Sequence, residues 1–259
     1  MKQEQNLDRR REGARRLRTI HIRATDLQSA IESLQEIRRT ERPALEPGIA
    51  SRYGKELDHL EKTVREGGFD ERLIDSPEVR ERRTAWFVEK TLSEANTLID
   101  AACLVFAHSV LDAHVFELCK LTAFLEPESW LSQIEKKQVT LLEAKAATYE
   151  SNRDRLLEKF FEDLDGRSLL WKIDLLHARC KPQNASTLRG FKFDRQKLDE
   201  IDRRRHEIVH GDALRTAGST LLDDVRFLNE TTDYCTIMVL DCYGLRASDE
   251  LGFSEEFLW

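Results

Sequence analysis

The sequence has few of the residues that make tight turns. It contains 11 glycines and 5 prolines among 259 residues. Sheet-rich folds need many turns, and these two residue types supply much of the turn geometry, so their scarcity favours long helices. No segment shows the alternation of apolar and polar residues that is typical of a half-buried strand. We therefore expect an all-α protein, and the chain is long enough for one large or two small domains with a real core.

The sequence also lacks paired cysteines, a signal peptide and a long apolar run. Its five cysteines are an odd number without a C-x-x-C pair, so we expect reduced core thiols in a cytoplasmic protein. The charged first forty residues predict no signal peptide. The most apolar run, residues 98–125, contains several charged residues and is not expected to enter a membrane. The net charge of −7 means that any nucleic-acid site must concentrate basic residues locally.

The periodicity of apolar residues predicts several helices. Gaps of three, four and seven in residues 7–41 predict one long helix. Two prolines and a glycine in residues 42–48 are expected to end it, with a second helix over 49–65. Ser76 and Pro77 are expected to open a helix that reaches Leu125. The remaining helices are expected over 130–161, 169–180, 194–211 and 219–243.

The second half of the helix expected over residues 77–125 differs from the other helices. Apolar residues cover most of its circumference. A helix of that kind is buried on several sides, so we expect it at the centre of a bundle. Asp112 lies within this apolar surface and needs a partner there.

Basic residues gather in the segment Asp202–Asp212. Three consecutive arginines, Arg203 to Arg205, precede His206 and His210, and a glycine follows. Cations beside an imidazole can hold a phosphate and move a proton, which are the two requirements for cleaving RNA without a metal. The alternative is a solvated basic helix end, where histidines favour the negative end of the helix dipole.

The six residues Arg205-His206-Glu-Ile-Val-His210 resemble the R-x4-6-H signature of the HEPN ribonuclease superfamily. In that family the residue after the arginine is usually Asn, Asp or His. The apolar segment around Asp112, with its embedded acidic residue, and the segment Leu169–Leu176 are also similar to parts of the family's bundle. The resemblance covers roughly residues 80 to 245.

The resemblance implies a domain organisation and a reaction. The expected organisation is a HEPN-like helical bundle over 76–246, an N-terminal helical extension over 1–75 and a C-terminal tail over 247–259. The implied activity is that of an endoribonuclease that needs no metal or other cofactor. Its products are a 2′,3′-cyclic phosphate and a 5′-hydroxyl.

The resemblance also implies roles for individual residues. His210 would be the acid–base group, Arg205 would hold the scissile phosphate, and His206 would assist. Glu207 and Asp112 would support the site, with Arg205 or His210 as the expected partner of Asp112. Contacts to the RNA are expected from Arg203, Arg204, Arg215 and Lys192.

The resemblance extends to partners and biological role. HEPN nucleases generally act as dimers, and a homodimer suits this chain because Arg205 and His210 lie about 140° apart on an ideal helix. The family commonly serves as toxins or as effectors against phage in the cytoplasm. Such a role implies an inhibitory or activating protein partner.

Two other interpretations stay open. His206-Glu207-x-x-His210 also spells the H-E-x-x-H zinc motif of metalloproteases, with Glu230 as a possible third ligand. Arginines rather than apolar residues precede the first histidine, and no strand is expected, so the context of a zinc protease is missing. The other alternative is a helical bundle without activity, a subunit or scaffold whose long charged N-terminal helices contact other helices.

Overall fold

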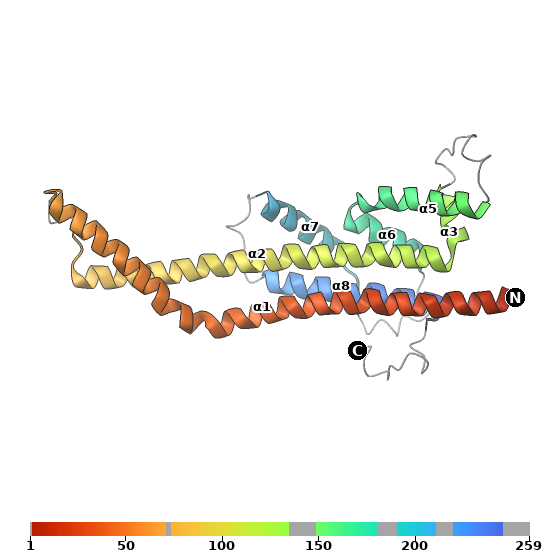
Figure 1. The fold of residues 1–259 in the computed structure, drawn as a ribbon, viewed down its shortest axis with the longest axis horizontal. Coiled ribbons are helices and arrows are strands. Elements are labelled where there is room, and N and C mark those ends of the chain that lie inside the picture. The colour runs from red at the N-terminus through yellow and green to blue at the C-terminus, as the bar shows by residue number, and fades with distance from the viewer. Residues whose placement is uncertain (1, 71–73, 135–148, 181–190, 211–219, 246–259) are drawn as a thin grey trace.

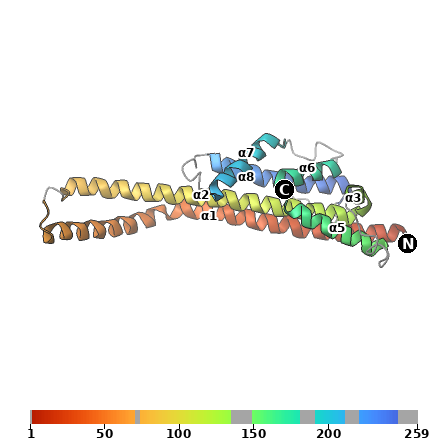
Figure 2. The ribbon, with the colours of Figure 1, turned by 90° about the horizontal axis from the view of Figure 1, so that it is seen from above.

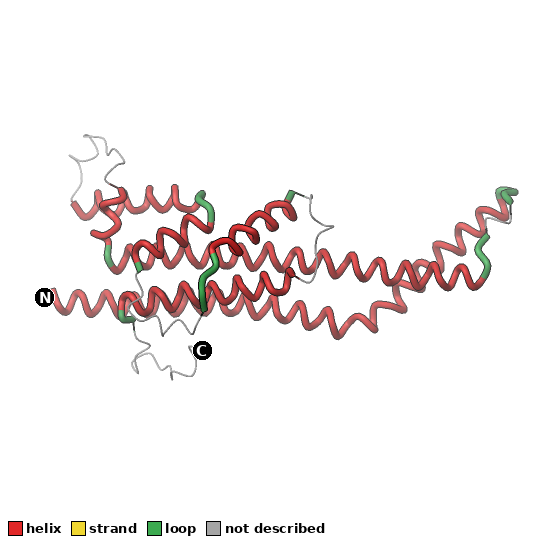
Figure 3. Tube along the Cα trace, turned by 180° about the vertical axis from the view of Figure 1, so that it is seen from behind, coloured by secondary structure: helices red, strands yellow, loops and turns green. Residues whose placement is uncertain are grey.

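The computed structural model describes residues 2–70, 74–134, 149–180, 191–210 and 220–245. Every regular element in these residues is an α-helix (Figure 3). The expectation of an all-α fold is therefore confirmed for the described part of the chain. The expected tail at 247–259 lies outside the described residues.

Two long antiparallel helices form the frame of the molecule. They are α1, Lys2–Glu66, and α2, Pro77–Leu125. The first half of α1 and the second half of α2 belong to the bundle, while their other halves project from it as a two-helix arm (Figures 1 and 2). Ser76 caps α2 and Pro77 is its first residue, as expected.

The arm, defined here as residues 42–66 and 77–89, is held by a few cross-helix contacts. The rings of Tyr53 and Phe87 stack with centroids 4.0 Å apart. Arg42 pairs with Glu89 at 2.6 Å. Arg80 binds the backbone oxygen of Gly54 and pairs with two acidic side chains, Asp58 and Glu61. These contacts tie the projecting parts of α1 and α2 together over most of the arm.

The predicted break at residues 42–48 is wrong, because Pro43 and Pro47 lie inside α1. The helix changes direction near them instead of ending (Figure 1). Each proline removes one N–H from the helix ladder, and both lie on the exposed side, where water satisfies the carbonyls left free. Packing against α2 on both sides of the bend keeps the helix continuous.

The second half of α2 is the centre of the bundle, as its apolar circumference predicted. Each of the other described helices contacts α2. Leu104, Leu111, Val115 and Leu118 of α2 are fully buried in the core. The first half of α1 supplies Leu17 and Ile31 to the same core, so this half of the expected N-terminal extension packs as part of the bundle.

Three shorter helices follow α2: α3, Pro127–Ile134, α5, Tyr149–Asp165, and α6, Leu169–Arg179. The indole ring of Trp130 lies 5.7 Å from the ring of Phe160. One straight helix would separate these two residues by about 45 Å. The expectation of one helix over 130–161 is therefore wrong, because burial of Trp130 between the two phenylalanines of α5 folds the chain back.

The last two helices complete the bundle. They are α7, Arg195–Val209, and α8, Thr220–Tyr243. The Asp194 side chain accepts a hydrogen bond from the Lys197 N–H at 3.0 Å, which confirms the expected cap of α7. Four of the five cysteines are buried and all are free thiols, in agreement with the expected core role. Burial raises the pKa of Cys119 to about 12, so this thiol stays protonated.

Of the described helices, α2 alone is long and apolar enough to cross a membrane, judged by length and composition. Half of its apolar window is buried against the other helices. A core helix at the centre of a bundle has the same composition. Length and composition therefore do not distinguish a membrane-spanning helix from a core helix.

A histidine buried between α2 and α8 makes the stability of the bundle depend on pH. His114 Nε2 lies 2.8 Å from Thr236 Oγ1. Burial lowers the pKa of His114 to about 3, against about 6.5 for an unfolded histidine. Between these values only the unfolded chain takes up the proton, so this residue costs stability as the pH falls below 6.5.

We expect the wild type to lose about 2 kcal/mol of unfolding free energy through His114 between pH 7 and pH 5. Urea unfolding at both pH values, with wild type and His114→Asn, measures this loss as the difference between the two proteins. The variant has no imidazole to protonate at this position, so its stability should fall less. An equal fall of the unfolding free energy in both proteins would contradict His114 as the origin of this pH dependence.

Candidate functional site

The motif residues lie at the C-terminal end of α7. Leu198 and Ile201 are fully buried in the core and fix the inner face of this helix. The last helical residue is Val209, and the N–H of His210 donates to the His206 carbonyl at 3.0 Å. The expected end of the helix near Gly211 agrees with this boundary, although Gly211 itself lies outside the described residues.

His206 and His210 form an exposed pair of imidazoles. Their ring centroids are 4.2 Å apart and the rings are inclined by 55°. Both side chains are exposed, and Val209 between them keeps 55 % of its surface exposed. A large substrate can therefore reach both imidazoles from solvent. Acid–base chemistry requires this access, because the group must come within hydrogen-bond reach of the proton that it moves.

Arg205 is oriented by a carboxylate of its own helix. Its Nη2 lies 3.0 Å from Oδ1 of Asp202, three residues earlier. The same oxygen lies 3.0 Å from Nε2 of His108, which is buried on α2. The approach of His108 is close but not aligned as a hydrogen bond of the ring N–H. Contact with His108, and then with Arg205, lowers the pKa of Asp202 to about 2, although partial burial opposes the shift.

The other basic residues predicted for the site have different surroundings. Arg204 pairs with Asp224 of α8, which is nearly fully buried. Burial raises the pKa of Asp224, and the charge of Arg204 opposes that shift. This ion pair ties α7 to α8 and does not leave Arg204 free to extend toward RNA. Arg203 and Lys192 are exposed, and Arg215 lies outside the described residues.

The expected partner of Asp112 is wrong. Both carboxylate oxygens of Asp112 lie 2.9 Å from Nζ of Lys172, on α6, and not beside Arg205 or His210. Lys172 is fully buried, and it also lies over the ring of Phe116. A fully buried ammonium requires an anion, and α6 brings it against the face of α2 that carries Asp112. Asp112 therefore joins two helices and does not belong to the motif.

The zinc interpretation loses its expected third ligand. Glu207 is partly buried, and Glu230 is exposed on α8. Within the described residues, which include His206, His210 and Glu230, no three His, Cys, Asp or Glu side chains are grouped so that they could hold a metal ion. Glu230 as the ligand that completes the H-E-x-x-H pair is therefore wrong.

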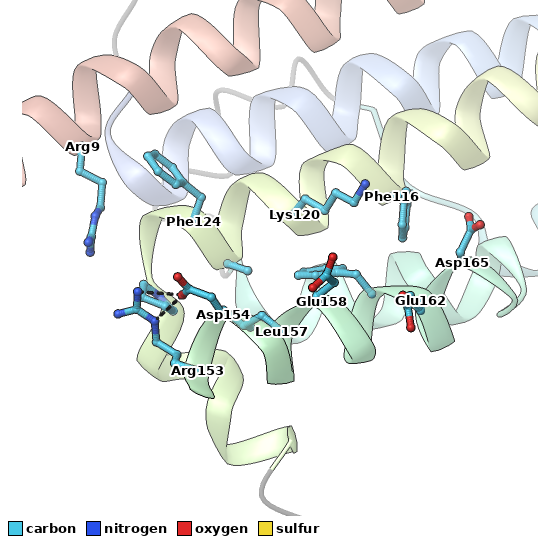
Figure 4. Close-up of a pocket in the computed structure, with 13 residues that line it drawn as sticks. Arg9, Phe116, Lys120, Phe124, Arg153, Asp154, Leu157, Glu158, Glu162 and Asp165 are labelled. Atoms are coloured by element: carbon cyan, nitrogen blue, oxygen red, sulfur yellow. Dashed lines mark hydrogen bonds and ion pairs between the residues drawn. The ribbon is translucent and has the colours of Figure 1, made fainter. Parts of the chain in front are cut away.

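A separate open groove of about 760 Å³ lies between α2 and α5 (Figure 4). Phe116, Leu157 and Phe161 are among its apolar lining residues, and Arg9 of α1 lies at one end. Four carboxylates also line it: Asp154, Glu158, Glu162 and Asp165. Three cationic side chains, Arg9, Lys120 and Arg153, line it as well, so the groove has no excess of positive charge to attract a phosphate backbone. None of the motif residues lines it.

Sequence reasoning missed two residues of the site. Neither His108 nor Asp202 was assigned a role from the sequence. The spacing of Asp202 and Arg205 is a usable signal, because residues three apart on a helix face each other. No sequence signal brings His108 to Asp202, since the contact joins two helices that are distant in the chain.

Comparison with known proteins gives no match. No protein-family model, no curated protein and no solved structure matches this chain. The resemblance to HEPN ribonucleases therefore rests on the sequence alone and stays a prediction.

Removal of either member of the Asp112–Lys172 pair should have unequal effects. Lys172 is 0 % exposed, whereas the Asp112 side chain keeps 34 % of its surface exposed. We expect Asp112→Ala to cost about 3 kcal/mol or more, because it leaves a buried ammonium unpaired. Lys172→Met should cost less, since Asp112 can turn to water. Urea unfolding of both variants measures the difference, and an equal or reversed order would contradict this account.

Proposed function

We propose that this protein is a metal-independent endoribonuclease of the HEPN type. Arg205 and His210 are the catalytic pair and His206 assists them. The observation that carries the proposal is the arrangement at the end of α7. Two exposed imidazoles 4.2 Å apart lie at the same helix end as an arginine that Asp202 contacts. An oriented guanidinium and an accessible proton carrier are the groups that this chemistry needs.

The reaction is an attack by the ribose 2′-hydroxyl on the adjacent phosphorus. The bond between the 2′-oxygen and phosphorus forms, and the bond from phosphorus to the 5′-oxygen breaks. One proton leaves the 2′-hydroxyl and one is delivered to the departing 5′-oxygen, and the exposed imidazoles can carry both transfers. The Arg205 guanidinium stabilises the charge that develops on the phosphate oxygens. The products are a 2′,3′-cyclic phosphate and a 5′-hydroxyl.

We propose further that the active form is a homodimer with the two motifs facing one cleft. Five positions separate Arg205 from His210, which on an ideal helix directs them about 140° apart. A second copy would bring a histidine from one chain toward the arginine of the other. The exposed Val209, an apolar side chain within the motif itself, supports contact at this surface.

The biological role that goes with this proposal is a cytoplasmic toxin or an effector against phage. A nuclease that can cut the RNA of its own cell needs restraint, so an inhibitory or activating protein partner belongs to the same proposal. The projecting arm is a candidate surface for it, since Trp86 and Leu60 are exposed there.

The proposal is tested by RNA cleavage with wild type, Arg205→Gln and His210→Ala, each with and without EDTA. We expect wild-type cleavage to survive EDTA and to leave cyclic phosphate ends. Both variants should lose roughly 100-fold or more of the rate, because a positioned acid–base group and a preorganised donor to the developing charge each contribute about that factor. His59→Ala, which removes an exposed histidine of the arm, is the matched control and should keep full activity.

Three outcomes would reject the ribonuclease. Cleavage that persists in His210→Ala points to a contaminating nuclease. The zinc protease takes its place if no RNA is cut and bound zinc and peptidase activity are lost together in EDTA. The absence of both activities, in the monomer and at concentrations that favour a dimer, leaves the non-catalytic bundle.

A further inference from the structure

We infer that His108 of α2 is a positioning residue for the motif arginine, acting through the carboxylate of Asp202. The inference rests on the proposed function, because it assigns to Arg205 the task of holding the scissile phosphate. It adds a residue from a distant part of the chain that the R-x4-6-H motif does not contain.

The geometry places one carboxylate oxygen of Asp202 between two side-chain nitrogens, one of His108 and one of Arg205. Asp202 Oδ1 lies 3.0 Å from His108 Nε2 and 3.0 Å from Arg205 Nη2. His108 is 5 % exposed, whereas Asp202 and Arg205 are partly exposed. The buried histidine on α2 is therefore the inner end of this chain of contacts, and the partly exposed guanidinium is its outer end.

The contact of Asp202 with Arg205 orients the arginine only weakly by itself. Partly exposed ion pairs three residues apart on a helix contribute little, because water competes and two long side chains must be ordered. A contact from a second helix removes part of this freedom, since the carboxylate can no longer follow the arginine into solvent. The position of Arg205 then depends on the packing of α7 against α2.

The guanidinium keeps donors for a substrate. Asp202 engages Nη2, while Nε of Arg205 is buried without a hydrogen-bond partner among the described residues. A guanidinium has five N–H donors in a fixed fork. Burial keeps the Nε donor away from a substrate, so the Nη donors that Asp202 does not engage are the ones left for phosphate oxygens. Fixing the fork before substrate binds increases the rate, because preorganised donors need no rearrangement during the reaction.

A purely structural role for His108 makes a different prediction, and α2 supplies a matched control for it. His114 is as well buried as His108 and lies on the same helix, but it faces Thr236 of α8. If His108 only fills the core, then replacing either histidine should lower activity only as far as it lowers the folded fraction. If His108 positions Arg205, replacing His108 should lower activity beyond the loss of folded protein, whereas replacing His114 should not.

The test compares His108→Leu, His108→Gln and His114→Leu, with RNA cleavage measured on folded protein. We expect His108→Leu to lower kcat at least 10-fold with a smaller change in KM. His108→Gln, which can return an amide nitrogen near the Nε2 position, should recover most of the rate. His114→Leu should lower stability but leave kcat within about 2-fold. In the background of Asp202→Asn, the further loss from His108→Leu should largely disappear, because both changes break the same chain of contacts.

A second readout does not depend on catalysis. The ¹⁵N–¹H resonance of the Arg205 side chain, assigned by its loss in Arg205→Gln, reports the order of the guanidinium. It should shift or broaden in His108→Leu and remain unchanged in His114→Leu. If wild type cuts no RNA but this pattern is seen, the positioning contact stands and the proposed function fails.

The inference is overturned if His108→Leu leaves both kcat and the Arg205 resonance unchanged. It is also overturned if the two leucine variants lose activity in the same proportion as their folded fraction. Should His108→Leu not fold, His108→Gln and Asp202→Asn carry the test. If the Arg205 resonance in Asp202→Asn is the same as in wild type, the contact is then rejected.

Discussion

Burial of the second half of α2 on most sides, with one exposed stripe that includes Phe106, Ser109 and Ala113, is the constraint on which the rest of the bundle depends. Every other described helix contacts α2. Its apolar residues supply the common core, and that part of the packing is not selective, since many helix arrangements bury leucine and valine equally well. Selectivity comes from the polar residues that α2 carries into this core, because each needs a partner at a defined place.

Three polar residues of α2 face three different helices. Asp112 binds Lys172 of α6, His114 contacts Thr236 of α8, and His108 contacts Asp202 of α7. An error of one residue in the register of any neighbouring helix would leave one of these groups buried without its partner. The polar contacts thereby determine which face of each helix meets α2. For α7 this choice brings Asp202 inward and leaves the two imidazoles exposed at the helix end.

The extent to which the sequence predicts this structure differs between local and distant contacts. Ser76 and Asp194 were recognisable as caps, because a cap depends on residues within one turn. The central place of α2 followed from its apolar circumference. The prolines of α1 led to a wrong prediction of a helix end. The tendency of proline to end a helix does not take into account the packing of α1 against α2 on both sides of the bend.

The partners across helices could not be derived from the sequence. Asp112 was recognised as a carboxylate that needs a cation, yet the chain offers 41 lysines and arginines. Composition does not distinguish Lys172 from the more conspicuous Arg205. The contact of His108 could not be predicted for the same reason. Nothing near residue 108 indicates that a helix almost a hundred residues later places a carboxylate beside it.

The ambiguity of the motif has the same origin. The residues His206 to His210 match the H-E-x-x-H pattern and also complete the R-x4-6-H pattern that begins at Arg205. These five residues alone do not separate the proposed ribonuclease from a zinc site. Zinc requires a third ligand held close to both imidazoles, whereas phosphate requires an oriented cation. The surroundings in the described part of the chain supply the cation, since Arg205 is held by Asp202, and they bring neither Glu230 nor another ligand-forming group into a set of three. The chemistry of a short motif is thus selected by residues outside it, and the residues to examine are those that fix the orientation of its charged side chains.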